Sequence, residues 1–311
     1  MKGITIGYYA AHEQFNPGEL LRLVQLAEKA GFKGALCADH FSPWSESQIE
    51  SGFDLSWLGA AMQATNLRFG LVNTSSQRYH PSVIAQAAAT LCQMFPLGFW
   101  IAVGNGQFMN EPVTGQRWLS ETERTQHLLE SVQIIRSLWR GELVTHKDQT
   151  EVYNAKLGTL PNYIPNLMGA AVTESAAECA GRWADGLITT SRPYDQLKRI
   201  IDAFRKGGGE GKPVYLKVQL SYDKSYAKAL AGAQQQWNSN MLLSGEREDG
   251  NNFSAIRVSG SLDQHAEWLW QDVEAGVSNL YLHNVNTEQQ QFIEDFGRKV
   301  LPNFHSSWLD E

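Results

Sequence analysis

Short apolar runs alternate with segments of helical periodicity along almost the whole chain. The run at 34–38 is typical of a buried strand, because its residues do not alternate between apolar and polar. Runs of this kind predict strands at residues 4–8, 34–38, 68–72, 98–103, 167–172, 187–190, 214–220 and 279–283. The segments between them predict helices at residues 17–30, 81–94, 121–140, 174–183, 194–206, 225–237 and 287–300. Strands separated by helices indicate a parallel sheet, and eight strand–helix units predict an α/β fold, the (β/α)8 or TIM barrel.

Capping residues mark the ends of the first predicted helix. Asn16 suits the N-cap, Pro17 the first helical position, and Gly31 the end. An open doubly wound sheet is the alternative fold, but the chain lacks a Gly-x-Gly-x-x-Gly turn after its first strand. No shift in composition marks a boundary, so residues 1–311 are expected to form one domain. Its loop insertions are expected at 42–57, 105–120, 141–166 and 240–262.

The composition is that of a soluble globular protein. Apolar residues make up 42% of the 311 residues, charged residues 19%, and the net charge is −7. This balance gives no electrostatic reason to bind nucleic acid or an anionic membrane. No stretch reaches the roughly 18 apolar residues of a membrane span, and the N-terminus has no signal-peptide pattern. The cysteines Cys37, Cys92 and Cys179 are scattered and odd in number, as expected of buried thiols in the cytoplasm.

Candidate chemistry lies directly after the predicted strands. Asp39 and His40 follow the run at 34–38, with Trp44 close behind. Taken alone, such an Asp-His pair is more often a cap and a structural histidine. In a parallel barrel, however, the carboxyl ends of all strands surround one mouth. Other polar or glycine residues at predicted strand ends are Glu13, Asn73, Thr74, Ser75, Asn105, Gly106, Gln107, Thr173, Glu174, Ser175 and Thr190.

This set lacks the usual catalytic motifs. The histidines have no metal-ligand spacing, and there is neither a Gly-x-Ser-x-Gly elbow nor a His-Glu-x-x-His helix. The glycine run at 207–211 predicts a turn and not a phosphate loop, since Lys206 and Pro213 stand where the motif needs glycine and Ser/Thr. Backbone amides, hydroxyls and glycines instead suit a polar ring system with a phosphate tail. Thr173 to Ser175 open a helix, where free amides attract phosphate; an ordinary N-cap is the alternative.

Several motifs resemble one known family, the luciferase-like flavin monooxygenase superfamily. They are Glu13-Gln14-Phe15, Ala38-Asp39-His40-Phe41 with Pro43-Trp44, Arg78-Tyr79-His80-Pro81, Val103-Gly104-Asn105-Gly106 and Asn110-Glu111. The resemblance is dense over 3–136, recurs at 170–191, and is nearest to the branch of deazaflavin (coenzyme F420)-dependent glucose-6-phosphate dehydrogenases. It implies a barrel with a flavin or deazaflavin in its mouth.

The resemblance also implies roles for individual residues. Asp39 would contact the cofactor, His40 would act as the base at the substrate carbon, and Trp44 and Glu13 would shape the substrate site. Further cofactor contacts would come from Asn73, Thr74, Asn105, Gly106, Gln107, Asn110, Ala171, Val172, Thr173, Glu174, Ser175 and Thr190. The family pattern places a non-proline cis peptide between Val72 and Asn73.

Three departures from the dehydrogenase branch shape the functional hypothesis. Gln107 replaces a proton-donating glutamate, and glutamine cannot deliver a proton near neutral pH. Thr173 to Ser175 resemble the phosphate turn of FMN-binding luciferases in place of a double-glycine turn. The cations that would hold a sugar phosphate have no clear equivalents, and Ala255 stands where an arginine is expected.

These departures favour an FMN-dependent oxidoreductase or monooxygenase. Its partners would be an unknown small-molecule substrate and a separate flavin reductase, with no metal ion. A coenzyme F420-dependent dehydrogenase is the first alternative, and a flavin-binding protein with little turnover is the second. A homodimer is expected, because barrels of this superfamily commonly pair.

Overall fold

A computed structural model of the chain describes residues 4–42, 48–74, 78–96, 98–243 and 256–305. Eight parallel strands close into a barrel, since each pairs with the next and the last pairs with the first. In barrel order they are β1 (Thr5–Tyr9), β2 (Gly34–Ala38), β3 (Arg68–Asn73), β4 (Phe99–Val103), β7 (Leu167–Ala170), β8 (Leu187–Thr190), β9 (Val214–Tyr222) and β11 (Asn279–Asn284). The predicted (β/α)8 barrel is confirmed.

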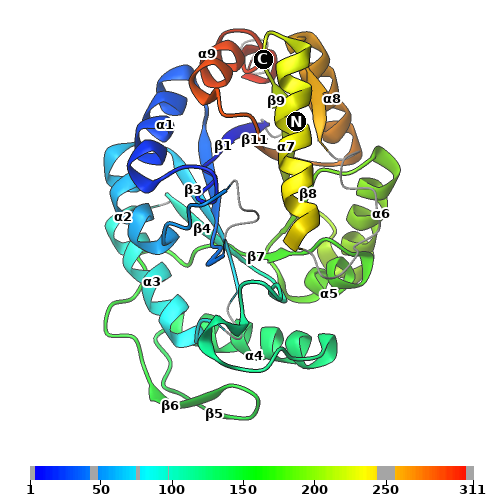
Figure 1. Cartoon of the computed structure of the whole chain (residues 1–311). Helices are drawn as coiled ribbons and strands as arrows, with labels where there is room; N and C mark the ends of the chain where they lie inside the picture. The colour runs from blue at the N-terminus through cyan, green and yellow to red at the C-terminus, as the bar shows by residue number, and fades with distance from the viewer. Residues whose placement is uncertain (1–3, 43–47, 75–77, 97, 244–255, 306–311) are drawn as a thin grey trace, which may run out of the picture.

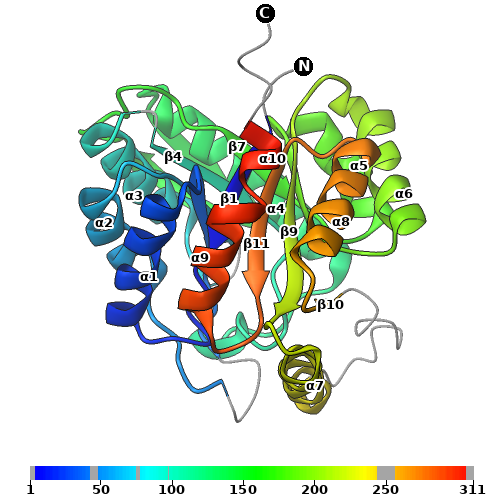
Figure 2. The ribbon, with the colours of Figure 1, turned by 90° about the horizontal axis from the view of Figure 1, so that it is seen from above.

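Helices surround the barrel, and Figure 1 looks into the carboxyl ends of its strands. The helices are α1 (Pro17–Ala30), α2 (Asp54–Ala64), α3 (Pro81–Met94), α4 (Glu121–Trp139), α5 (Glu174–Trp183), α6 (Tyr194–Phe204), α7 (Tyr226–Leu243), α8 (Leu262–Ala275), α9 (Gln289–Lys299) and α10 (Pro302–His305). Figure 2 shows α7 beyond the arrowheads of β9 and β11, at the end of the barrel that we call the mouth. None of these helices has the length and apolar character needed to cross a bilayer, as far as the described residues show.

The first helix begins and ends where its caps predict. The Asn16 side chain accepts a hydrogen bond from the Glu19 amide, and Gly31 closes the helix with a φ of 101°. A positive φ is favourable for glycine, which has no Cβ to clash with the backbone. Local sequence therefore sets the connection that leads from β1 to β2.

Several elements were not predicted. Among them are the helices α2, α8 and the short α10, the exposed hairpin of β5 (Val144–Lys147) and β6 (Glu151–Ala155), and the short strand β10 (Arg257–Ser259), which extends the sheet along β9. In α8, the buried face contains His265 and Asp272, which interrupt the apolar periodicity. The hairpin lies within the predicted insertion 141–166 and has few buried side chains.

The glycine run near residue 207 forms the π-helical turn η2 (Arg205–Gly209), packed against α5. A Cβ atom on Gly207 would lie 2.0 Å from the carbonyl oxygen of Glu178, and one on Gly181 would lie 2.4 Å from that of Phe204. The glycines therefore permit close backbone packing, in agreement with a turn and not a phosphate loop. Cys37 and Cys92 are buried, Cys179 is partly buried, and all three are free thiols.

Two levels of side chains fill the barrel interior. The lower level contains the aromatic rings of Trp100, Tyr215 and Tyr281, whose centroids lie 4.9 to 6.1 Å apart. Two residues further along their strands, the upper level is divided by residue type. On β1, β9 and β11 it contains the polar side chains Tyr9, Lys217 and His283; on β2, β3, β4 and β7 it contains the small or aliphatic residues Ala38, Val72, Ala102 and Ala170. The barrel order places these two groups on opposite sides of the mouth.

We expect Gly70→Ala to destabilise the fold by about 1–3 kcal/mol, because core overpacking forces neighbouring groups to move. A Cβ atom on Gly70 would lie 2.0 Å from Cζ2 of Trp100. The matched control is Gly59→Ala in α2, where nothing lies within 4 Å of the new Cβ. That change should stabilise the helix by up to about 1 kcal/mol. Urea unfolding measures both effects, and an unchanged midpoint for Gly70→Ala would contradict the described packing.

Candidate active site

Asp39 is the centre of a buried hydrogen-bond network at the end of β2. Its Oδ2 accepts a hydrogen bond from Nδ2 of Asn73 at 2.9 Å and lies 3.3 Å from Nη2 of Arg78. The same Nη2 donates to the backbone oxygen of Asp39 at 2.6 Å. Burial raises the pKa of Asp39, although the Arg78 guanidinium opposes that shift. The network fixes Asp39 in position, and with it the start of the next loop.

Asn110 holds the loop that follows His40. Its Oδ1 accepts hydrogen bonds from the amides of Phe41 at 2.9 Å and Ser42 at 3.1 Å. Its Nδ2 donates to Oε1 of Gln107 at 3.2 Å, so the exposed Gln107 side chain is tied to the same network. The β4 loop thus positions the β2 loop, and a contact 69 residues apart in sequence fixes the surroundings of His40.

Glu111 supports the network from below. Its Oε2 accepts a hydrogen bond from the Arg78 amide at 2.9 Å, and its side chain is buried. Burial raises the pKa of Glu111. Gly106 has a φ of 79°, and a Cβ atom on it would lie 2.9 Å from Cγ of Glu111. A glycine is therefore needed here both for the backbone conformation and for space.

His40 is electrically neutral at physiological pH. Burial lowers its pKa to about 3, and the charges of Lys217, Arg78 and His12 add to the shift. A neutral imidazole has one nitrogen that accepts a proton and one that donates a hydrogen bond. His40 can thus act as a base next to a group bound in the mouth.

Glu13 follows β1 and contacts Tyr9 on the polar side of the mouth. It is 1% exposed, and its Oε1 accepts a hydrogen bond from the Tyr9 hydroxyl at 3.4 Å. Its Oε2 is buried and has no hydrogen-bond partner among the described residues. Burial raises the pKa of Glu13, while the Lys217 ammonium opposes that shift.

Sequence reasoning missed Lys217 and His283 on the same side. The Lys217 Nζ lies 3.9 Å from the centroid of the Tyr9 ring, and the His283 ring lies 4.5 Å from it. Polar residues at alternate positions of β9, such as Lys217 and Gln219, are typical of a strand face in contact with water. In a closed barrel that face points into the mouth instead, which only the fold reveals.

The opposite side of the mouth suits a flat ring. Its upper-level residues are small or aliphatic. Asn73 and Asn105 each have a buried Oδ1 with no hydrogen-bond partner among the described residues. Nδ2 of Asn105 donates to Thr125, and Nδ2 of Asn73 to Asp39. The two carbonyl oxygens can accept hydrogen bonds from the N–H groups of a heterocyclic ring, so these acceptors fit a flavin or deazaflavin.

The predicted phosphate turn is an N-cap. Oγ1 of Thr173 accepts a hydrogen bond from the Ala176 amide at 3.3 Å and lies 3.2 Å from Oγ of Ser175. Glu174 forms a 3.1 Å ion pair with Arg199 of α6 on the surface. The predicted contacts before and after this turn are Ala171, which is buried, Val172, which is exposed, and Thr190, which is partly buried. The capping interpretation is confirmed, and binding of a phosphate remains a prediction.

Two further predictions meet the structure differently. The predicted cis peptide between Val72 and Asn73 is wrong, since the described residues contain no cis bond. Asn73 instead continues β3, in register with Val103 of β4.

Trp44 and Ser75 lie outside the described residues. Thr74, directly after β3, is partly buried and hydrogen-bonds Glu111.

A buried His12–Asp54 pair lies between the barrel and its helices. The His12 Nε2 is 2.9 Å from Oδ1 of Asp54, and both side chains are at most 1% exposed. Cys37 adds a third ligand atom, and all three atoms lie within 4.8 Å of one another. Because the imidazole and the carboxylate face each other directly at 2.9 Å, the structure describes a histidine–carboxylate contact more readily than a metal site.

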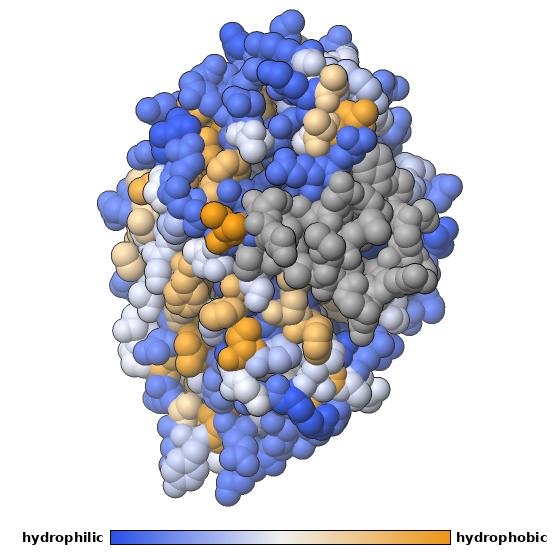
Figure 3. Space-filling model, viewed as in Figure 1, coloured by the Kyte–Doolittle hydropathy of each residue, from blue (hydrophilic) through white to orange (hydrophobic). Residues whose placement is uncertain are grey.

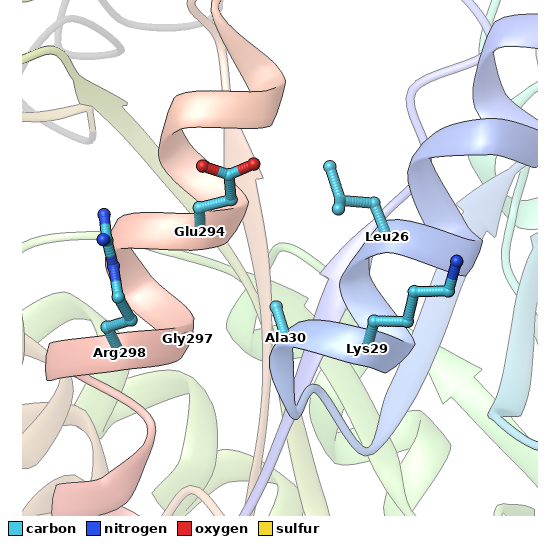
Figure 4. A pocket seen from close by; sticks show the side chains of 6 residues that line it. All are labelled: Leu26, Lys29, Ala30, Glu294, Gly297 and Arg298. Carbon is cyan, nitrogen blue, oxygen red and sulfur yellow. The ribbon is translucent and has the colours of Figure 1, made fainter.

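Apolar side chains gather among hydrophilic ones on the face of the mouth (Figure 3). Exposed examples in the loops after β2, β4 and β7 are Phe41, Ile49, Phe108, Val113 and Val172. Exposed apolar side chains beside a few polar groups are typical of small-molecule sites. The pocket in Figure 4 is a different feature, because it lies between the last turns of α1 and α9, at the opposite end of the barrel, and is lined by Leu26, Lys29, Ala30, Glu294, Gly297 and Arg298.

Comparison with known proteins identifies the family and its relatives. The family model for luciferase-like monooxygenase matches residues 4–291. The F420-dependent glucose-6-phosphate dehydrogenase of Beutenbergia cavernae is 33% identical over 332 aligned residues, which cover 97% of this chain and 98% of that protein. A solved F420-dependent secondary alcohol dehydrogenase, in complex with an F420-acetone adduct, is 28% identical with a TM-score of 0.88, covering 96% of this chain and 98% of that one.

A solved long-chain alkane monooxygenase is 16% identical with a TM-score of 0.75, covering 97% of this chain and 91% of that one, and shows the shared fold alone. The predicted FMN-dependent monooxygenase is therefore wrong, because the better-matched relatives are F420-dependent dehydrogenases. The features that suggested FMN are local. Gln107 is part of a hydrogen-bond network, Thr173 caps a helix, and missing sugar-phosphate cations concern the substrate and not the cofactor.

Proposed function

The chain belongs to the luciferase-like monooxygenase family of oxidoreductases, and from this premise we propose that it is a coenzyme F420-dependent dehydrogenase of a small alcohol. The observation that carries the proposal is the neutral His40 held next to the Asp39–Arg78–Asn73 network. Support also comes from the 28% identity with a secondary alcohol dehydrogenase that uses this cofactor. Two classes of relative, acting on a phosphosugar and on a simple alcohol, share the oxidation of a hydroxyl-bearing carbon.

In this proposal His40 is the base. Bound F420 supplies a two-electron acceptor for hydride. The neutral imidazole would accept the hydroxyl proton of the alcohol, whose two-electron oxidation gives the carbonyl compound. Gln107 cannot act as an acid, so proton transfer at the substrate depends on His40.

The remaining predicted contacts divide into three groups. The contacts proposed for the ring are Asp39, Asn73, Thr74, Asn105, Gly106, Gln107 and Asn110. Those proposed for the phosphate tail are Ala171, Val172, Thr173, Glu174, Ser175 and Thr190, and those proposed for the substrate are Glu13 and Trp44. The free amides at the start of α5 support the second group, since a helix N-terminus attracts anions.

The low pKa of His40 predicts the pH dependence of alcohol oxidation. A base works in its deprotonated form, and an ordinary histidine would lose activity below about pH 6.5. Since the His40 pKa lies near 3, kcat/KM should show no acid limb at an apparent pKa near 6.5. A pH–rate profile between about pH 5 and 8 checks this. An acid limb near pH 6.5 that disappears in His40→Asn would contradict the buried environment.

Cofactor affinity tests the proposal directly. Fluorescence titration of the purified protein should give a dissociation constant for F420 at least about tenfold below that for FMN, a difference of about 1.4 kcal/mol. Tighter binding of FMN would overturn the proposal. Asn73→Ala should weaken F420 binding, whereas Asn303→Ala on the surface helix α10 is the matched control.

Three expectations accompany the proposal. We propose a small-molecule substrate, a homodimer and a cytoplasmic location, the last supported by the three free cysteines. A separate flavin reductase belongs with the rejected FMN hypothesis, and a dehydrogenase does not require one.

A further inference from the structure

We propose that Lys217 selects substrates in which a carboxylate lies close to the hydroxyl-bearing carbon. This inference rests on the proposed dehydrogenase function and names its substrate class, the short hydroxy acids. Lys217 would bind the carboxylate while His40 takes the hydroxyl proton. It is thus a specificity-determining residue for the reaction.

The fold directs Lys217 into the mouth. On β9 the residues Leu216 and Val218 belong to the core between barrel and helices, whereas Tyr215 belongs to the barrel interior. Alternation along the strand points Lys217 to the same side as Tyr215, one level nearer the mouth. The position of its Nζ, 3.9 Å from the centroid of the Tyr9 ring, agrees with this direction.

The Lys217 ammonium has no carboxylate within ion-pair distance among the described residues. Lys206 on the surface, in contrast, forms a 3.0 Å ion pair with Glu178. Glu13 is the acid that acts on Lys217 electrostatically, but its hydrogen-bond partner is Tyr9. Lys217 is partly buried, and the Tyr9 ring replaces only part of the hydration that its ammonium loses. An anionic group on the substrate would supply the missing partner.

Two polar atoms near Lys217 could also bind a ligand. Oε2 of Glu13 and Nδ1 of His283 are buried and have no hydrogen-bond partner among the described residues. The opposite ring nitrogen, Nε2 of His283, lies 2.8 Å from Oε1 of Gln14, which fixes the ring. Lys217, His283 and Glu13 all contact Tyr9 and so lie close together, and a substrate with two or three oxygen atoms would use several such polar atoms.

Two observations favour a carboxylate near the reacting carbon over a distant phosphate. Lys217 is a single compact cation, whereas phosphate sites usually combine several cations or amides. Arg78 is not available as a second cation, because it is bound to Asp39. The Lys217 Nζ lies 3.9 Å from the centroid of the Tyr9 ring on β1, and β1 pairs directly with β2, the strand that leads to His40. An anion held by Lys217 would therefore lie on the side of the mouth next to His40.

The experiment compares two probes that differ in one group, 3-hydroxybutyrate and butan-2-ol. Both have a secondary alcohol, and the first has a carboxylate where the second has a methyl group. With F420, the wild-type protein should prefer 3-hydroxybutyrate in kcat/KM by at least about tenfold. Lys217→Met should abolish this preference, whereas Lys217→Arg should retain part of it. Lys198→Met removes a surface lysine paired with Asp202 and should change neither rate.

Binding gives a readout independent of turnover. Calorimetry should show that 3-hydroxybutyrate binds the wild-type protein at least about tenfold more tightly than Lys217→Met. If butan-2-ol is oxidised as well as 3-hydroxybutyrate, the inference is overturned while the dehydrogenase function stands. If none of the alcohols tested with F420 is oxidised but Lys217-dependent binding of 3-hydroxybutyrate is found, the anion site stands and the proposed function fails. Equal binding by Lys217→Met, with circular dichroism like that of the wild type, overturns the inference.

Discussion

Replacing His40 by asparagine should lower kcat for alcohol oxidation by about 10²–10⁴-fold, the usual contribution of a general base. Asparagine can hydrogen-bond the substrate hydroxyl but cannot take its proton. We therefore expect kcat to fall far more than KM rises, because the substitution removes proton transfer but leaves the contacts that bind the substrate. Steady-state kinetics with F420 and a secondary alcohol measures the split.

The matched control is His146→Asn. His146 lies on the outer hairpin and contacts Glu130 at 3.1 Å, away from the barrel mouth. It should leave kcat within about twofold of the wild type, as a change outside the site should. If the His40→Asn enzyme kept the wild-type kcat, His40 would have a structural role and no catalytic one.

Arg78→Met should destabilise the fold by about 3–5 kcal/mol, the cost of leaving a buried charge without its partner. The substitution removes the guanidinium from the Asp39 carboxylate and from the backbone oxygen of Asp39. Protonation of Asp39 would limit the loss, since burial already raises its pKa. Urea unfolding at neutral pH measures the change, which is a large part of the total stability of an ordinary domain.

Two further variants make this prediction sharp. The double change Arg78→Met with Asp39→Asn removes both charges and should recover part of the stability. Arg22→Met removes an exposed ion pair with Glu19 on α1 and should cost less than about 1 kcal/mol. If Arg78→Met and Arg22→Met had equal effects, the Asp39–Arg78 pair would not be the buried anchor described here.

The barrel was predictable because its strands are buried on both sides. Runs such as 34–38 have no polar residue, and every residue of β2 is buried. Capping residues made the ends of helices predictable, as Asn16 and Gly31 show for α1. Prediction failed where burial and polarity do not coincide. The buried His265 and Asp272 obscure α8, and the exposed hairpin β5–β6 has almost no buried face.

The candidate site was predictable only at strand ends. Asp39 and His40 follow an apolar run directly, so their place in the barrel follows from the fold. Their supports come from other loops, since Asn110 and Arg78 reach them only in three dimensions. Polar residues alternate with apolar ones around Lys217, both in a strand with one face in water and in a strand that lines a barrel. Local sequence alone therefore cannot tell whether Lys217 faces water or the barrel mouth.

The cofactor hypothesis failed for a related reason. In the sequence, a single replacement such as Gln107 suggests a change of chemistry, although the proposed ring site is distributed over several loops. It also includes Asp39 and Asn73, which hydrogen-bond each other, and Gly106, which packs against Glu111. The cofactor depends on this whole surface, and one altered donor does not decide it.

Reduction of F420 by an alcohol tests the central claim most directly. The purified protein is mixed with oxidised F420 and, in turn, with propan-2-ol, butan-2-ol, 3-hydroxybutyrate and glucose 6-phosphate. We predict that at least one alcohol bleaches the visible absorbance of F420 and yields the matching carbonyl compound, that His40→Asn abolishes the reaction, and that FMN does not replace F420. Failure of every alcohol with F420, together with oxygen-dependent oxidation of reduced FMN by the same protein, would contradict the account.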